Sequence, residues 1–240
     1  EAKELFKSLD AELAIVVAYG KILPDELLHT PKYGCINMHA SLLPKLRGAA
    51  PIQWAVITGE KRTGVTSMQM DAGIDTGDML LSKSVDIGEN ETAEELHDRL
   101  SVLGAEVMRE TISALQAGEL HPVKQDDKQS THAPILTKEL SKIDWNDTAQ
   151  HIHDKIRGLY SWPGATCEFK GKVIKIHSSR LAGECSGKPG EVSESDKRLV
   201  VCCGDGNAVE ILVLQAPGKR AMPAGDFLRG NPIEKGAFFE

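Results

Sequence analysis

Asn37 and His39 stand two residues apart in the stretch CINMHASLLPKLRG, residues 35–48. Residues 34–38 have the pattern of a buried strand, and side chains two apart in a strand lie on the same face, about 6.5–7 Å apart. At the carboxyl end of a strand, an amide and an imidazole can donate hydrogen bonds to one developing oxyanion. Imidazole can also move a proton near neutral pH. The alternative for this pair alone is an ordinary strand end, where Asn and His form caps and turns.

A carboxylate that could complete such a site occurs in DAGIDTGD, residues 71–78. This stretch joins two expected strands and contains three carboxylates and two glycines, which allow a tight loop around a ligand. Asp75 lies between the glycines and is the best candidate to orient His39 and to favour its protonated form.

Other familiar chemistries are not supported. Ser41 has no Gly-x-Ser-x-Gly setting, so we do not expect it to be a nucleophile. His151 and His153 lie about 200° apart around an expected helix and cannot bind a metal together from one face. An amide, an imidazole and a carboxylate suit direct transfer of an acyl group through a tetrahedral intermediate, and they suit hydrolysis equally. The residue chemistry alone leaves both reactions open.

The elements around these residues alternate between strands and helices. Residues 1–10, 24 onward, 49–57 and 92–116 are helical in pattern, whereas 14–18, 34–38, 64–70 and 79–85 have strand patterns. This order predicts an α/β domain with a mostly parallel sheet. A sheet of this kind normally has more strands ahead of the first one here, so we expect an N-terminal portion to be absent from this sequence.

The second half of the chain has a different pattern. Residues 117–143 are polar and look like a linker, and residues 148–160 predict a helix. Short strands then recur at 165–169, 172–178, 190–192, 199–203 and 209–214, which predicts a small antiparallel barrel. We therefore expect a catalytic domain at 1–130, a linker at 131–143 and a barrel domain at 144–240.

Composition limits the class of protein. The net charge of −7 argues against sequence-independent nucleic-acid binding, but residues 131–180 have a local net charge of +3. The five cysteines lack zinc-site spacing, so reduced thiols in a cytoplasmic protein are the simplest interpretation. No apolar run approaches the roughly 20 residues that span a bilayer. No exposed hydrophobic seam is evident, which favours a monomer.

The combination of Asn37-x-His39, the following SLLP turn and Asp75 in DAGIDTGD resembles the 10-formyltetrahydrofolate-dependent formyltransferases. The further segments HASLLPKLRGAAPIQWAVITGE, IRGLYSWPGA and LQAPGKRAMPAGDFLRG narrow the resemblance to the methionyl-tRNA formyltransferases. It extends from about Val16 to Gly230. It implies a Rossmann-like formyl-transfer domain, whose first strands are missing here, and a C-terminal OB-like β-barrel.

The resemblance also implies residue roles. Asn37, His39 and Asp75 match the catalytic residues. The positions that match the folate-contacting loops are Ser41, Leu42, Leu43 and Pro44, then Ala18, Tyr19, Gly20, Ile22 and Leu23, and also Asp71, Ala72, Gly73 and Ile74. Lys138, Lys142 and Lys172 are candidates for contacts with tRNA phosphates. No metal is implied.

The implied activity is transfer of a formyl group from 10-formyltetrahydrofolate to the α-amino group of initiator methionyl-tRNA. Three alternatives remain. A relative that formylates a small amine and a formyltetrahydrofolate hydrolase would both keep the same catalytic residues. A non-catalytic folate- or RNA-binding module is the alternative from another class.

Overall fold

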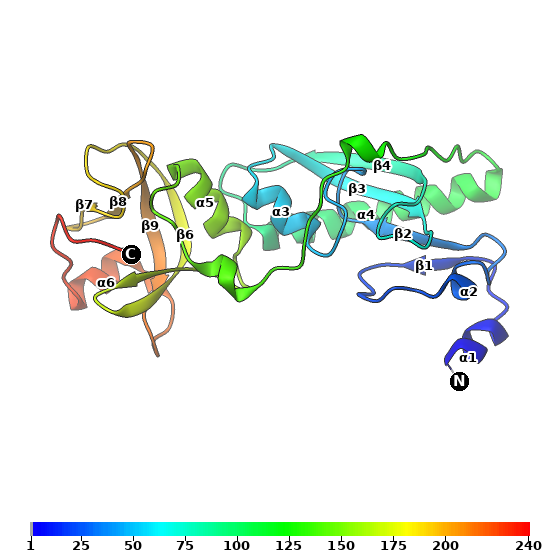
Figure 1. The fold of residues 1–240 in the computed structure, drawn as a ribbon, viewed down its shortest axis with the longest axis horizontal. Helices are drawn as coiled ribbons and strands as arrows, with labels where there is room; N and C mark the ends of the chain where they lie inside the picture. Colours follow the sequence, from blue (N-terminus) through cyan, green and yellow to red (C-terminus); the bar gives the residue numbers. More distant parts are fainter. Residues whose placement is uncertain (1) are drawn as a thin grey trace. The chain divides into compact units, whose positions relative to one another are not determined.

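The computed structural model describes residues 2–240. The chain forms two compact units (Figure 1). The first unit runs to Trp54 and adds Lys61–Ile87 and Leu96–Ile135. The second contains Ala55–Glu60, Gly88–Glu95 and Leu136–Glu240.

The first unit contains a four-stranded sheet in the order β1-β2-β3-β4. Its strands are β1 (Ala14–Val16), β2 (Cys35–His39), β3 (Arg62–Gln69) and β4 (Met79–Asp86). Among the described strands only β1 and β2 pair in parallel, so the prediction of a mostly parallel sheet is wrong for this chain. The connection between Gln69 and Met79 is too short for the crossover that parallel neighbours need, which makes β3 and β4 antiparallel.

Helices α1 (Ala2–Ser8) and α2 (Asp25–Leu28) and most of α3 (Pro51–Ile57) and α4 (Ala93–Ala117) belong to the same unit. A capping box begins α4, because Thr92 and Glu95 exchange hydrogen bonds. α4 packs on one face of the sheet, where a Cβ on Gly104 would lie 3.2 Å from Cγ of Met38. Side chains alternate along β2, so Asn37 and His39 point to the opposite face.

The stretch after α4 is more than a linker. Val123 and Met79 exchange backbone hydrogen bonds of 2.9 Å in each direction. The short 3₁₀ helix η1 (Asp127–Gln129) follows, and Thr131 and Ala133 then bond to the backbone of Arg47. We call residues 123–133 the belt segment, because they follow the site loops of the first unit.

The continuous part of the second unit, from Leu136 onward, begins with the 3₁₀ helix η2 (Lys138–Ser141) and helix α5 (Ala149–Gly158). Its sheet runs in the order β5-β6-β9-β8-β7, with β10 also pairing with β9, and every pairing is antiparallel. The remaining bounds are β5 (Ala165–Phe169), β6 (Lys172–Glu184), β7 (Val192–Glu194), β8 (Leu199–Cys202), β9 (Asn207–Gln215), β10 (Met222–Pro223) and α6 (Ala224–Gly230). The antiparallel prediction is confirmed. β5 and β7 end the path without pairing with each other, so the described strands do not form the expected closed barrel.

A C-terminal segment, residues 236–240, bonds to both ends of this sheet. Glu240 and Glu168 of β5 exchange backbone hydrogen bonds of 2.7 and 2.9 Å. On the other side, the Ala237 carbonyl accepts from the amide of Val192 in β7 at 2.8 Å. The Phe239 ring lies 5.0 Å from that of Phe169, so the segment also covers the core between the two edges.

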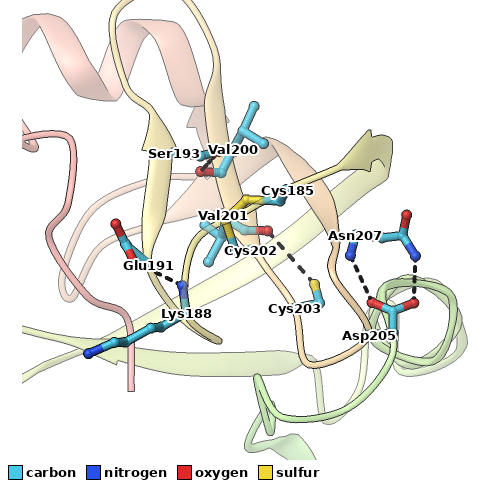
Figure 2. The surroundings of a disulfide bond; sticks show 10 residues. All are labelled: Cys185, Lys188, Glu191, Ser193, Val200, Val201, Cys202, Cys203, Asp205 and Asn207. Atoms are coloured by element: carbon cyan, nitrogen blue, oxygen red, sulfur yellow. Dashed lines mark hydrogen bonds between the residues drawn. A yellow bond between two sulfur atoms is a disulfide. The ribbon is translucent and has the colours of Figure 1, made fainter.

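Cys185 and Cys202 form a disulfide in the second unit (Figure 2). This corrects the expectation that all five cysteines are reduced. β6 and β8 both pair with β9, which brings the end of β6 close to Cys202 and gives a Cα–Cα distance of 5.6 Å. Cys35, Cys167 and Cys203 are buried free thiols, and burial raises the pKa of Cys167 and Cys203 to about 12.

Candidate active site

Asn37 presents its side chain on the face of β2 that is opposite α4. Its backbone lies opposite Val16 of β1 and Met68 of β3, so the strand is fixed on both sides. The side chain is half-buried, and its amide makes no hydrogen bond to any residue that the structure describes. It is therefore available to donate to a ligand.

His39 is buried, with 5% of its surface exposed. Its Nε2 lies 2.9 Å from the Leu46 carbonyl oxygen, and because a carbonyl only accepts, Nε2 carries a proton. Its Nδ1 lies 3.5 Å from Oδ2 of Asp75. Both ring nitrogens thus face protein acceptors. This differs from the expectation that His39 donates to the oxyanion, which would require the Leu46 contact to open.

Asp75 reaches His39 because the β3–β4 connection folds back over the sheet. Its backbone adopts a φ of +54°, which is uncommon outside glycine. Oδ2 accepts a hydrogen bond of 2.8 Å from the amide of Gly48. Oδ1 has no hydrogen-bond partner among residues 2–240 and remains free to accept or return a proton.

Gly48 is a site residue that the motifs did not single out. Its φ is +119°, and a Cβ there would lie 2.7 Å from the carbonyl oxygen of Ala133. Only glycine fits this position and still directs its amide at Asp75. The one signal in the sequence is the glycine that ends the PKLRG stretch.

The SLLP turn is held by its own polar groups. Ser41 is fully buried and its hydroxyl donates to the Lys45 carbonyl at 2.6 Å. Thr66 of β3 donates to the Ser41 carbonyl at 2.7 Å. Ser41 is thus engaged within the turn. Leu43 is also buried, so Leu42 and Pro44 are the members of the expected folate-contacting turn that reach solvent.

The other positions expected to contact folate lie in two exposed loops. The exposed fractions of Tyr19, Ile22 and Ile74 are 58%, 77% and 58%. Asp71 organises the second loop, because its Oδ1 accepts hydrogen bonds from the amide of Gly73 and the hydroxyl of Thr76. Exposed apolar side chains that form a patch can mark a ligand-binding surface. The remaining positions in these loops are Ala18, Gly20, Leu23 and Ala72.

The three lysines proposed for tRNA belong to the second unit and are exposed. Lys138 begins η2, which contacts β5, and Lys142 bridges to Thr166 of β5. Lys172 begins β6 opposite Phe169 of β5. The fold therefore gathers all three around one strand, although Lys172 lies 30 residues after Lys142 in the sequence.

His151 and His153 have separate environments, as their spacing predicts. His151 is exposed and lies 3.0 Å from Oδ1 of Asp147, whereas His153 is buried against Ser179. No group of three or more His, Cys, Asp or Glu side chains within residues 2–240 could hold a metal ion. In the same range, no helix is both long and apolar enough to cross a membrane.

Comparisons with known proteins agree with this architecture. The formyl transferase family model matches residues 1–112, and the model of the formyl transferase C-terminal domain matches residues 135–232. A methionyl-tRNA formyltransferase of Caldanaerobacter subterraneus subsp. tengcongensis is 50% identical over 235 residues, covering 98% of this chain and 76% of that protein. The methionyl-tRNA formyltransferase of Geobacter metallireducens is 49% identical, covering 96% of this chain and 74% of that protein.

Solved structures share the fold at lower identity. HypX from Aquifex aeolicus, crystallised with tetrahydrofolic acid, has a TM-score of 0.70 at 23% identity, over 99% of this chain and 44% of that one. The sugar 3N-formyl transferase WlaRD has a TM-score of 0.71 at 22% identity, over 89% of this chain and 77% of that one. From its two matched domains and its close relatives, the chain belongs to the methionyl-tRNA formyltransferase family.

Proposed function

We propose that the protein transfers a formyl group from 10-formyltetrahydrofolate to the α-amino group of methionine on initiator tRNA. The observation that carries this proposal is the free amide of Asn37 on the same face of β2 as His39, whose ring contacts the carboxylate of Asp75. The methionyl-tRNA formyltransferases that cover nearly the whole chain support the choice of acceptor. We further propose that the protein is cytoplasmic and acts as a monomer.

The reaction begins when the uncharged amine attacks the formyl carbon and the carbonyl electron pair moves to oxygen. The Asn37 amide donates a hydrogen bond to that oxyanion. Stabilisation of developing charge by a fixed donor is usually the largest single contribution to the rate enhancement of an enzyme. The tetrahedral intermediate then collapses, and the bond between the formyl carbon and the folate nitrogen breaks. The formyl carbonyl is thereby restored on the methionine nitrogen.

One proton must move from the attacking nitrogen to the departing folate nitrogen. The free Oδ1 of Asp75 is suited to accept and return it, directly or through a water. His39 holds the other carboxylate oxygen from the Nδ1 side, and the Leu46 carbonyl fixes the ring from the Nε2 side. In this scheme His39 orients Asp75, and it assists the oxyanion only if its contact with Leu46 opens.

Folate is proposed to lie against the exposed apolar side chains of the loops at 18–23 and 71–74. Lys138, Lys142 and Lys172 are proposed to contact tRNA phosphates. Such contacts are electrostatic and independent of sequence. They supply affinity, whereas the chemistry depends on the first unit.

The test is a formyl-transfer assay with the natural full-length protein, charged initiator tRNA and 10-formyltetrahydrofolate. We expect formyl-methionyl-tRNA to form and formate to stay at background when tRNA is omitted. Steady release of formate without tRNA would instead identify a hydrolase. Binding of both substrates with no product would identify a binding module, and in either case the proposed transfer would be rejected.

A further inference from the structure

We propose that Gln125 and Arg47 are positioning residues that clamp the loop carrying Asp75. This inference rests on the proposed function, because it assigns the clamp to the same carboxylate. Both residues lie outside the loop: Arg47 follows the SLLP turn, and Gln125 belongs to the belt segment. Neither is expected to touch the reacting atoms.

The side-chain amide of Gln125 donates hydrogen bonds to two backbone carbonyls of the loop. Its Nε2 donates to the backbone carbonyl of Asp75 at 2.8 Å and to that of Gly77 at 2.7 Å. These two bonds use both protons of the amide nitrogen. One side chain thus fixes the backbone of Asp75 itself and of Gly77, two residues later.

Arg47 determines the orientation of that amide. Its Nε lies 2.9 Å from Oε1 of Gln125, and a guanidinium only donates, so the oxygen must face Arg47 and the nitrogen must face the loop. Arg47 is itself fixed, since 11% of its side chain is exposed and its Nη2 lies 2.8 Å from Oδ1 of Asp127. The amide therefore has one orientation that satisfies every partner.

Asp75 has a left-handed backbone conformation, which costs energy for residues other than glycine. Such a conformation persists when surrounding contacts hold it, and the clamp supplies such contacts. The contacts of Asp71 with Gly73 and Thr76 hold the loop on either side of Asp75, but they reach neither its backbone carbonyl nor its carboxylate. The Asp75 carboxylate must also keep its hydrogen bond from the Gly48 amide and its contact with the His39 ring. A shift of about 1 Å at a reacting group can reduce the rate about 100-fold.

The same belt segment holds the other side of the site. The amide of Arg47 donates to the Thr131 carbonyl at 2.9 Å, and the Arg47 carbonyl accepts from Ala133 at 2.7 Å. Arg47 lies between Leu46, which accepts from His39, and Gly48, which donates to Asp75. The clamp thus connects the backbone groups that hold His39 and Asp75 in place.

The test compares Gln125→Ala and Gln125→Glu with the unmodified full-length protein. The carboxylate that Gln125→Glu introduces would keep the contact with Arg47 but has no proton to donate to the two loop carbonyls. A purely structural role predicts that both variants lose stability while the folded protein keeps its normal kcat. Positioning predicts that both variants lose kcat by about 10- to 100-fold while KM for folate and tRNA stays nearly unchanged. Gln129→Ala is the matched control, because Gln129 is exposed and, among residues 2–240, its side chain bonds only to Asp126 of its own segment.

A second measurement does not depend on turnover. Hydrogen–deuterium exchange in residues 71–79 should accelerate in both Gln125 variants, but not in Gln129→Ala, and exchange in β9 should not change. Unchanged exchange in the loop, or near-normal kcat in Gln125→Glu, would overturn the proposal. If the unmodified protein transfers no formyl group, the proposed function fails, and the exchange measurement still decides whether the clamp exists.

Discussion

At the scale of single residues, the site depends on which polar groups the protein has already paired. His39 and Oδ2 of Asp75 are committed to protein partners, whereas the Asn37 amide and Oδ1 of Asp75 are not, among the residues that the structure describes. The motifs in the sequence singled out these three residues as candidates for the site. They did not reveal that His39 donates to Leu46, because that contact depends on the path of the turn between them.

Replacing Asn37 tests the oxyanion assignment. We expect Asn37→Ala to lower kcat by roughly 10²–10³ with little change in KM, since the lost hydrogen bond forms fully only in the transition state. Single-turnover and steady-state formyl transfer measure this split. A variant with near-normal kcat would show that another group stabilises the oxyanion.

Gly48 gives a second prediction at this scale. Gly48→Ala should lower both stability and kcat, because the new Cβ would meet the Ala133 carbonyl and displace the amide that holds Asp75. Gly118→Ala is the control: its φ is also positive, at +71°, but a Cβ there meets nothing within 4 Å. Urea unfolding and kcat compare the two. Equal loss of stability, with normal kcat in Gly48→Ala, would contradict the role of Gly48.

At the scale of elements, local patterns predicted most helices and strands but not how they pair. The long helix and the antiparallel C-terminal strands follow from periodicity and turn signals within short windows. The direction of β3 and the contacts of the belt segment depend on residues distant in sequence. Gln125, for example, lies 50 residues from Asp75, in a polar stretch whose composition is that of a linker.

Helix α5 shows what burial does to polar groups at this scale. Arg157 and Asp154 form a buried ion pair of 2.7 Å, and Arg157 also donates to the Glu91 carbonyl at 2.9 Å. On the same helix, His153 lies between Ser179 and the Glu89 carbonyl. Burial lowers the pKa of His153 below its ordinary value of 6.5, so the folded protein favours the neutral ring.

This shift predicts a loss of stability in acid. Between the lowered pKa and 6.5 the unfolded chain binds more protons than the folded one, so the free energy of unfolding falls as pH drops below 6.5. The slope from this one group is at most about 1.4 kcal/mol per pH unit. Urea unfolding from about pH 7.5 to about pH 5 measures it. His153→Gln should flatten the curve, and the exposed His151→Gln should not; identical curves would exclude His153 as the source.

At the scale of the whole molecule, an acidic protein is proposed to bind a polyanion. The net charge is −7, and the fold gathers Lys138, Lys142 and Lys172 around β5. Changing each lysine to Gln should reduce the slope of log affinity against log salt by about one unit, without changing kcat at saturating tRNA. Titration of tRNA binding at several salt concentrations measures the slope. An unchanged slope in the triple variant would show that tRNA binds to a different surface of the protein.

The C-terminal segment has a consequence for how the second unit is made. β5 is synthesised well before Glu240, which lies 72 residues after its partner Glu168. Until residues 236–240 emerge from the ribosome, the backbone groups of both outer strands are exposed to pairing with other nascent chains. The segment that completes the sheet therefore also ends the exposure of these two edges to other nascent chains.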